Sequence, residues 1–526
     1  MGRDGVTVAQ RWLALVLVLL LGVAACTSNG KTDAPAAPAE QPPVADKGAP
    51  TPGGTLRVAL PSAPVLDPAL ADEPAEVIVA ELLFTPLVGI ELGTGALRPG
   101  VAGTWTADEA QQRFTFQLRD SARFSDGSPI TSGDVKATLE RVTNPATASP
   151  LASLLEPVAS IETPTPASVV VVLSRPLSTL PWVLSDPGLG IAPAAALADS
   201  AAFAAKPTGS GPFRVKSVEG TTVTLEKVPD GTAYVDTVRL FVPDGGAAGA
   251  LTAVTQDKAD VSLLSRERAI EATQQNIKTV KAPYLAVGSY GLNTRSPNLA
   301  DPRLRHAIIR AIDPTPMVAR AYGPSASVPD GLIARGVDGA TTGACAQRCN
   351  YDPAVSRSIL ALAFPDGNIP PVYVDFDESA VQRVLAETLR DQLSAVGIPT
   401  FLRPHTFEEY DQFLAAGTAD IFRLGWVADY PSALAFLSPL FVPGAGENVT
   451  GMNSPAVTDA LGAAERAADA AVRNERLAAA ERGVLDAFVV APIVQFNTTL
   501  AIGAAVRGAK VNVFGGFEPG EIWLQK

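Results

Sequence analysis

The sequence predicts an α/β protein with more than one domain, and two observations carry that prediction. The chain has 526 residues, and single hydrophobic cores stop growing at about 250–300 residues, so two or three domains are expected. Short segments with strand-like alternation, such as 55–60 and 114–119, are interleaved with helical patterns, such as 75–84 and 381–396. Interleaved strands and helices favour mixed α/β layers.

The first residues are typical of an exported protein. An apolar run at 12–25 follows Arg3 and Arg11 and is shorter than the roughly 20 residues that span a bilayer as a helix. This pattern, with small residues at its end, predicts a signal peptide at 1–25. VAAC at 23–26 resembles the lipobox of bacterial lipoproteins, which implies a diacylated Cys26 that anchors the chain to the outer face of the cytoplasmic membrane. The alternative is an ordinary signal peptide with an unrelated cysteine.

Residues 26–52 are predicted to be the lipidated cysteine and a tether. Pro and Ala dominate this stretch, and it has no apolar periodicity. At about 3.1 Å per residue, its 26 residues after Cys26 would reach roughly 80 Å from the lipid. The folded body is therefore expected to begin at Gly53.

Composition and missing motifs argue against several classes of function. The net charge of −13 argues against a nucleic-acid partner, which requires a concentrated basic face. Two His and three Cys leave little for a metal site, so no metal and no cofactor are expected. The sequence contains no Gly-x-Ser-x-Gly elbow, phosphate-binding glycine loop or HExxH helix. We expect a binding protein and not an enzyme.

Capping signals and apolar stripes predict individual helices. Thr131 and Asp134 have the spacing of a capping box and open a helix with Val135, Leu139 and Val142 on one face. Asp301, followed by a proline, is expected to cap a second helix. A third helix is predicted from a stripe that stops at Gly397 and comprises Val381, Leu385, Leu389, Leu393 and Val396.

A series of short motifs follows the body of the chain in a fixed order. They are LDP at 66–68, TG at 94–95, LRP at 97–99, FTFQLR at 114–119, FSDGSP at 124–129, DV at 134–135, GSGPF at 209–213, Asn293, DPRLR at 301–305, AID at 311–313, YDP at 351–353, VGI at 396–398 and GWVADYP at 425–431. Together they resemble the extracytoplasmic solute-binding proteins of ABC importers, in the family that includes oligopeptide- and dipeptide-binding proteins (solute-binding family 5).

Two positions depart from the pattern of that family. Ser432 and Ala433 stand where the family often has an acidic residue and a proline, and Pro314 stands where a basic residue is common. These differences leave the ligand subclass open.

The resemblance implies a two-lobed periplasmic-binding-protein-like fold (type II, cluster C) with an additional inserted subdomain. Two crossing segments would join the lobes, so lobe one would be discontinuous in sequence. The expected division is 53–84, 206–300 and 492–526 for lobe one, 85–205 for the inserted subdomain and 301–491 for lobe two.

The resemblance also implies a function. The expected protein is a monomeric, lipid-anchored receptor that captures peptides in the cleft between the lobes and delivers them to a membrane permease with separate ATPase subunits. Two alternatives stay open: a non-transport envelope scaffold or regulator with the same fold, and a binder of another solute such as a nickel chelate or a sugar.

The resemblance implies a ligand site around the GWVADYP motif. Asp429 would pair with the α-ammonium group of a peptide, because a desolvated ammonium group needs a negative partner. Gly425 would let the ligand approach the backbone, and Trp426 would form a wall of the site. The alternatives are an Asp that caps a local turn and a Trp in the core. Tyr290 and Asn293 would hydrogen-bond an extended peptide, or else simply end a strand.

Cys345 and Cys349 are candidates for a disulfide. An exported protein folds in an oxidising compartment, and three residues separate the two cysteines. The loop is short, so the bond would contribute only about 2 kcal/mol to stability. The alternative is a reactive or metal-binding pair.

Overall fold

The computed structural model describes residues 48–229, 231–518 and 520–525. The predicted signal peptide, Cys26 and nearly all of the predicted tether lie outside these residues. In the described part of the chain, no helix combines the length and apolarity needed to cross a membrane.

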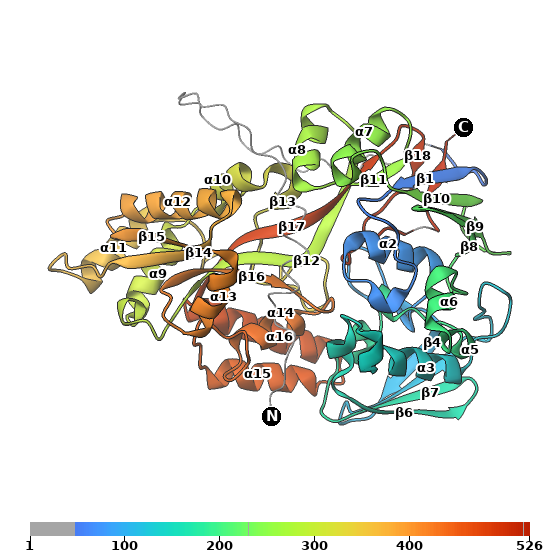
Figure 1. Cartoon of the computed structure of the whole chain (residues 1–526). Helices are drawn as coiled ribbons and strands as arrows, with labels where there is room; N and C mark the ends of the chain where they lie inside the picture. Colours follow the sequence, from blue (N-terminus) through green and yellow to red (C-terminus); the bar gives the residue numbers. More distant parts are fainter. Residues whose placement is uncertain (1–47, 230, 519, 526) are drawn as a thin grey trace.

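One large mixed sheet runs through the molecule (Figure 1). Its strands, in spatial order, are β15 (Thr400–His405), β14 (Val372–Asp377), β16 (Ile421–Val427), β12 (Thr279–Leu292), β17 (Val490–Ile502), β11 (Val261–Leu263), β1 (Thr55–Ala59), β10 (Thr237–Phe241), β9 (Thr222–Lys227) and β8 (Phe213–Glu219), with β13 (Ala326–Ser327) paired to β17. The middle pairs of the sheet are antiparallel, parallel pairs flank them on both sides, and the edge formed by β10, β9 and β8 is antiparallel again.

The two longest strands, β12 and β17, join the two halves of this sheet. They pair antiparallel from Thr279 opposite Ala501 to Gly291 opposite Val490. On one side β12 pairs with β16, and on the other side β17 pairs with β11. Both strands are largely buried because apolar residues on their two faces pack into separate cores. The exact lobe boundaries proposed above stay a prediction.

A second, antiparallel sheet lies apart from the first, in the cyan and teal part of Figure 1. Helix α3 (Ser132–Thr143) packs on it, and the predicted capping box of Thr131 and Asp134 is confirmed, with Val135, Leu139 and Val142 buried. The strands are β4 (Ala102–Ala107), β5 (Arg113–Leu118), β7 (Ser168–Leu173) and β6 (Val158–Thr165), preceded by the hairpin β2 (Val88–Ile90) and β3 (Leu97–Pro99).

The other two predicted helices are also confirmed. The Asp301 carboxylate accepts the Arg303 backbone N–H at 2.8 Å and caps α9 (Pro302–Ala311). Helix α12 (Ala380–Ala395) buries Leu385, Leu389 and Leu393 of the predicted stripe, and Gly397 follows with a φ of 94°. The remaining helices are α2 (Pro74–Leu83), α4 (Leu180–Val183), α5 (Ala194–Leu197), α6 (Ser200–Ala205), α7 (Ala250–Thr255), α8 (Arg266–Gln274), α10 (Pro314–Ala321), α11 (Pro353–Ala363), α13 (Phe407–Ala415), α14 (Ala433–Phe441), α15 (Pro455–Glu465) and α16 (Ala470–Asp486); the short strands β18 (Val506–Arg507) and β19 (Trp523–Leu524) pair near the C-terminus.

The segment that carries the second sheet packs directly on helices α15 and α16. The Ser178 hydroxyl donates to the Ala464 carbonyl at 2.8 Å. The Arg473 guanidinium of α16 lies over the Trp182 ring, 4.5 Å from its centroid, and pairs with Asp338 at 3.1 Å. The Trp182 indole N–H donates to the Gly95 carbonyl at 2.9 Å. These contacts join parts of the chain nearly 300 residues apart.

In the structure Cys345 and Cys349 form a disulfide, with Cα atoms 4.9 Å apart. The Cys349 backbone N–H also donates to the Cys345 carbonyl at 3.0 Å, so the bond closes a single turn. This turn ends the loop that follows β13.

A buried carboxyl on α16 is expected to make stability depend on pH. Glu481 is 1% exposed, and burial raises its pKa from 4.5 to about 7, although its carboxylate accepts the Leu332 N–H at 2.8 Å. The folded protein therefore keeps this proton up to about pH 7, whereas the unfolded chain loses it near pH 4.5. Stability should fall as the pH rises through this window, by up to about 1.4 kcal/mol per pH unit.

The substitution Glu481→Gln should remove this fall in stability. Urea denaturation between pH 4.5 and 8 measures it, with Glu475→Gln as the control because Glu475 is exposed on the same helix. Parallel pH profiles for the wild type and Glu481→Gln would show that Glu481 does not titrate as described.

Candidate functional site

A cavity of about 340 Å³ lies beside the crossing strands, and Asp429 is one of its lining residues. One wall comes from residues 71–77 at the start of α2 and from 263–265. Residues 284–286 of β12 and 427–429 at the end of β16 also line it. The cavity is therefore built from helix and strand segments that are far apart in the sequence.

The cavity is acidic. Four carboxylic acids line it, Asp72, Glu73, Asp186 and Asp429, and no Lys or Arg is among its lining residues. Burial raises the pKa of Tyr284, another lining residue, and the charges of Asp72, Asp186 and Glu73 raise it further. Burial also raises the pKa of Glu73, with added repulsion from neighbouring carboxylates. Walls of one charge favour a ligand group of the opposite charge, here a cation.

Local structure explains where these carboxylates stand. Glu73 begins α2 just before Pro74, and Asp186 begins a short 3₁₀ turn by accepting the Gly188 N–H at 2.7 Å. Acidic residues are favoured at such helix starts. Asp429 follows the last strand residues of β16, where the Ala428 N–H still donates to the Leu285 carbonyl at 2.8 Å. Glu73, Asp186 and Asp429 are thus held at or just beyond the ends of regular elements.

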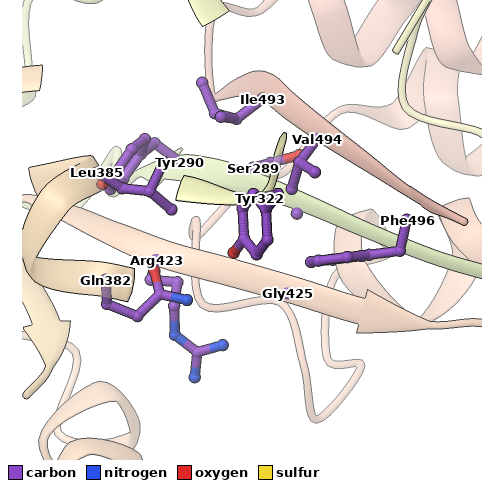
Figure 2. Close-up of a pocket in the computed structure, with 11 residues that line it drawn as sticks. Ser289, Tyr290, Tyr322, Gln382, Leu385, Arg423, Gly425, Ile493, Val494 and Phe496 are labelled. Atoms are coloured by element: carbon purple, nitrogen blue, oxygen red, sulfur yellow. The ribbon is translucent and has the colours of Figure 1, made fainter. Parts of the chain in front are cut away.

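Gly425 and Tyr290 line a different and much smaller cavity, of about 40 Å³ (Figure 2). Gly425 lies opposite Gly288 in the β12–β16 pair, and Tyr290 lies opposite Arg423. Tyr290 is only 2% exposed, and its hydroxyl has no hydrogen-bond partner among the described residues. A cavity of this size can hold a water molecule that bonds to the Tyr290 hydroxyl. Phe496 lines both cavities, so the smaller one lies next to that of Asp429.

Trp426 lies in the hydrophobic core, which was the alternative interpretation of this residue. It is 8% exposed, and its indole N–H donates to the Ala435 carbonyl of α14 at 2.7 Å. Successive strand residues point to opposite faces, so Trp426 points away from the face of Gly425 and Val427. Trp426 therefore lines neither cavity and packs in the core on the other face of β16.

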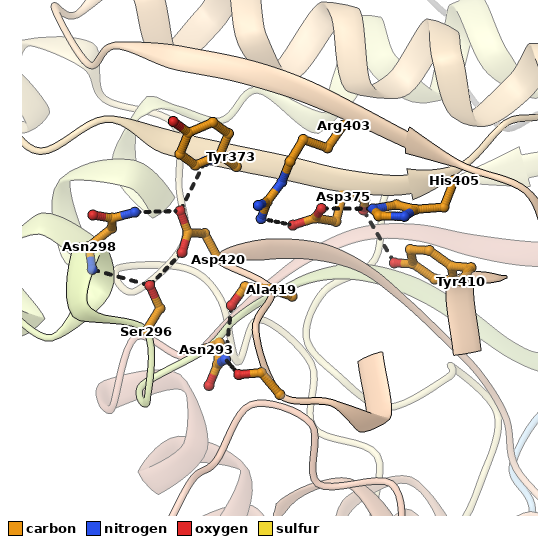
Figure 3. Close-up of polar contacts among 11 residues, drawn as sticks. Asn293, Ser296, Asn298, Tyr373, Asp375, Arg403, His405, Tyr410, Ala419 and Asp420 are labelled. Carbon is orange, nitrogen blue, oxygen red and sulfur yellow. Dashed lines mark hydrogen bonds and ion pairs between the residues drawn. The ribbon is translucent and has the colours of Figure 1, made fainter. Parts of the chain in front are cut away.

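Asn293 is fully buried, and its side chain hydrogen-bonds backbone groups of neighbouring segments (Figure 3). Its amide donates to the carbonyls of Gly417 and Ala419, at 2.9 and 2.8 Å, and its side-chain oxygen accepts the Arg295 N–H at 3.0 Å. These bonds fix the turn that leads into β16. Asn293 therefore positions the strand that carries Asp429, and no polar atom of its amide is left for a peptide.

Ion pairs and hydrogen bonds connect β14, β15 and α13 to one another and to β16 (Figure 3). The buried Asp375 carboxylate pairs with Arg403 at 2.8 Å and with His405 at 2.9 Å, and burial raises its pKa despite these partners. The Tyr410 hydroxyl donates to the Asp375 and Arg423 carbonyls. Within the described residues, no group of three His, Cys, Asp or Glu side chains is placed to hold a metal ion.

One edge of β16 is open along most of its length. In the described structure β14 pairs with β16 only at Ile421 and Phe422, so residues 423–427 have no strand partner on that side. An open strand edge can accept an extended peptide as an added strand. This edge leads toward Asp429.

The sequence interpretation missed Asp72, Glu73, Asp186 and Tyr284. The DEP sequence at 72–74 is a helix-start signal, and it carries no sign that its carboxylates face a residue more than 350 positions later. Only the tertiary fold brings these groups to one cavity.

Comparison with known proteins identifies relatives of this chain. The family profile of bacterial extracellular solute-binding proteins, family 5 (middle), matches residues 96–448. A Brucella ovis protein named as an ABC transporter peptide-binding protein is 29% identical over 426 residues, covering 75% of this chain and 78% of the relative. A glutathione-binding protein of Salmonella typhi is 25% identical over 389 residues, covering 72% and 75% of the two chains.

Solved structures share the fold. The unliganded open form of MppA, a periplasmic murein tripeptide-binding protein, has a TM-score of 0.82 at 20% identity and covers 91% of this chain and 99% of its own. The Haemophilus influenzae OppA complex with the peptide RPPGFSPFR has a TM-score of 0.62 at 18% identity, covering 90% and 99% of the two chains. The expected type II binding-protein fold is thereby confirmed.

Proposed function

Because the chain belongs to the bacterial extracellular solute-binding proteins of family 5, we propose that it is the receptor of an ABC importer that captures peptides in the cavity lined by Asp429. Relatives are named as peptide- and glutathione-binding proteins. Both kinds of ligand carry a free ammonium group. A permease and separate ATPase subunits would then take the ligand across the membrane.

The position of Asp429 carries this proposal. Its carboxylate lines a cavity with three other acidic side chains and with no basic one among the lining residues. An ammonium group that leaves water loses its solvation and needs a negative partner at close range. Asp429 supplies that partner, and the surrounding carboxylates add a favourable potential.

The peptide backbone would lie along the open edge of β16. Residues 424–427 offer backbone groups with no strand partner on that side, whereas the Arg423 carbonyl already accepts the Tyr410 hydroxyl. Main-chain hydrogen bonds of this kind bind a peptide without reading its side chains. Gly425 in this stretch adds no side chain that would block the approach.

Capture would involve closure of the two halves around the ligand. The strands β12 and β17 join these halves, and a ligand that makes more contacts in the closed form shifts the equilibrium toward it. No step of this cycle needs catalysis by the chain. Lipidation at Cys26 would keep the receptor near its permease and raise the effective concentration.

The test is calorimetry with an alanine tripeptide and its N-acetylated form. Acetylation removes the ammonium group and leaves the rest of the peptide unchanged. We expect the free peptide to bind and acetylation to weaken binding by about 3 kcal/mol or more, since one charge of the pair is lost. Equal affinity for the two peptides would contradict the role of the ammonium group, and no binding of any short peptide would contradict the proposed function.

A further inference from the structure

A second and larger cavity, of about 800 Å³, adjoins the one that contains Asp429. It is lined by the hairpin β2–β3 and the turn at 121–130, together with residues near 211, 283, 335 and 512. Phe514 is the one lining residue that the two cavities share among the described residues. This second cavity is not part of the site described above.

Four arginines line the second cavity: Arg98, Arg119, Arg123 and Arg335. Arg98 pairs with Glu518 at 3.0 Å. In the described structure none of the other three has a carboxylate partner. Arg123 donates only to the carbonyls of Asp120 and Ala122, at 2.7 and 2.8 Å.

Arg335 and Arg119 have the most unused hydrogen-bonding capacity. Arg335 donates to the Ser327 hydroxyl at 2.9 Å and to the Val328 carbonyl at 3.4 Å, while its Nε is buried with no partner in the described part of the molecule. The Arg119 guanidinium makes no side-chain hydrogen bond or ion pair with any described residue. A guanidinium group carries five N–H donors. The buried Arg335 Nε is left unsatisfied only at some cost in free energy.

The acidic residues of the cavity do not balance these charges. Glu518 is already paired with Arg98, and Glu91 accepts the Thr94 hydroxyl at 3.0 Å. Burial and the charge of Glu518 raise the pKa of Glu81 well above its usual range, so this group favours its neutral form. Burial and the nearby charge of Arg98 lower the pKa of Arg119, because like charges crowd this wall. An anion in the cavity would relieve that repulsion.

We propose that this second cavity is a binding site for an oxyanion group, a carboxylate or a phosphate, held by Arg119 and Arg335 with Arg98 and Arg123 at its rim. Guanidinium groups bind such groups through paired, charge-assisted hydrogen bonds. The group belongs either to a free small anion or to the acidic end of a peptide whose amino end lies in the cavity of Asp429. In the second case, which rests on the proposed function, the two cavities of opposite charge would orient a zwitterionic ligand.

Calorimetry at low ionic strength tests this site with two sets of probes. Citrate and inorganic phosphate represent free anions. A pentapeptide of five alanines with a free C-terminal carboxylate, compared with the same peptide carrying a C-terminal amide, represents the acidic end of a peptide. The variants are Arg119→Gln and Arg335→Gln, and the control is Arg357→Gln, because Arg357 is exposed on α11 and lines neither cavity.

We expect Arg119→Gln to weaken the binding of the anionic probe by about tenfold or more, with no change for the peptide with a C-terminal amide. The Arg119 side chain makes no hydrogen bond or ion pair with a described residue, so we expect its replacement to leave the fold intact. Binding of citrate or phosphate identifies a free anion as the ligand, and a preference for the free carboxylate over the amide that the variant abolishes identifies the peptide. If neither citrate nor phosphate binds and the two peptides bind equally well, or if Arg357→Gln has the same effect as Arg119→Gln, the site is refuted. Binding of the alanine tripeptide in that case leaves the peptide receptor intact.

Discussion

Replacing Asp429 with alanine is expected to weaken the binding of a free peptide by about two to four orders of magnitude. The change leaves the ligand's ammonium group buried without its charge partner, which costs about 3–5 kcal/mol. Calorimetry with the alanine tripeptide measures the effect. Asp429→Asn should lose nearly as much, because the amide keeps the shape and lacks the charge.

A matched control separates this effect from general electrostatics. Asp120→Asn removes one negative charge from an exposed position that lines neither cavity, and it should leave peptide affinity unchanged. The variants should unfold at the same urea concentration as the wild type. Full peptide affinity in Asp429→Ala would place the ammonium group elsewhere in the acidic cavity, at Asp72, Glu73 or Asp186.

Replacing Arg473 with methionine is expected to destabilise the protein by about 3 kcal/mol or more. Arg473 is 5% exposed, pairs with the largely buried Asp338 and lies on the Trp182 ring. Methionine keeps part of the packing on the ring but leaves the Asp338 carboxylate buried and unpaired. The same residues join α16 to the segment that carries the second sheet, so the loss should also weaken that contact.

Urea denaturation of the Arg473 variant measures the loss. Arg476→Met serves as the control, because Arg476 is exposed on the same helix. In a double-mutant cycle, Asp338→Asn should restore part of the stability lost in Arg473→Met, since it removes the unpaired charge. Effects of the two substitutions that simply add would mean that the ion pair contributes little.

The helices predicted from the sequence are those whose signals are local. The capping box of Thr131 and Asp134 and the Asp301 cap act within one turn, so neighbouring residues decide where α3 and α9 begin. The apolar stripe of α12 has the helical period along its whole length. The fold family also followed from motifs that stand in a fixed order along the chain.

The candidate site was less accessible from the sequence, because it depends on which strand face meets which cavity. Gly425 and Trp426 are adjacent, so they must point to opposite faces of β16, and no local signal says which face borders the cavity. The structure puts the indole in the core. Asn293 is a polar residue at a strand end in either interpretation, and only its contacts with Gly417 and Ala419 reveal that it supports the backbone.

The two charged cavities could not have been predicted from spacing. Asp72 and Asp186 line one cavity with Asp429, and Arg119 lines the other with Arg335. More than 200 residues of chain separate the partners in each set. Each of these residues taken alone resembles a solvated surface charge. Their convergence depends on how the second sheet and the hairpin before it pack against the large sheet.

The most direct test of the account is a crystal structure of the protein with the alanine tripeptide bound. The account predicts that the peptide lies along residues 423–427 with its ammonium nitrogen about 2.8 Å from a carboxylate oxygen of Asp429. A peptide bound elsewhere on the molecule, or one whose amino end points to solvent while Asp429 contacts only protein groups, would contradict it.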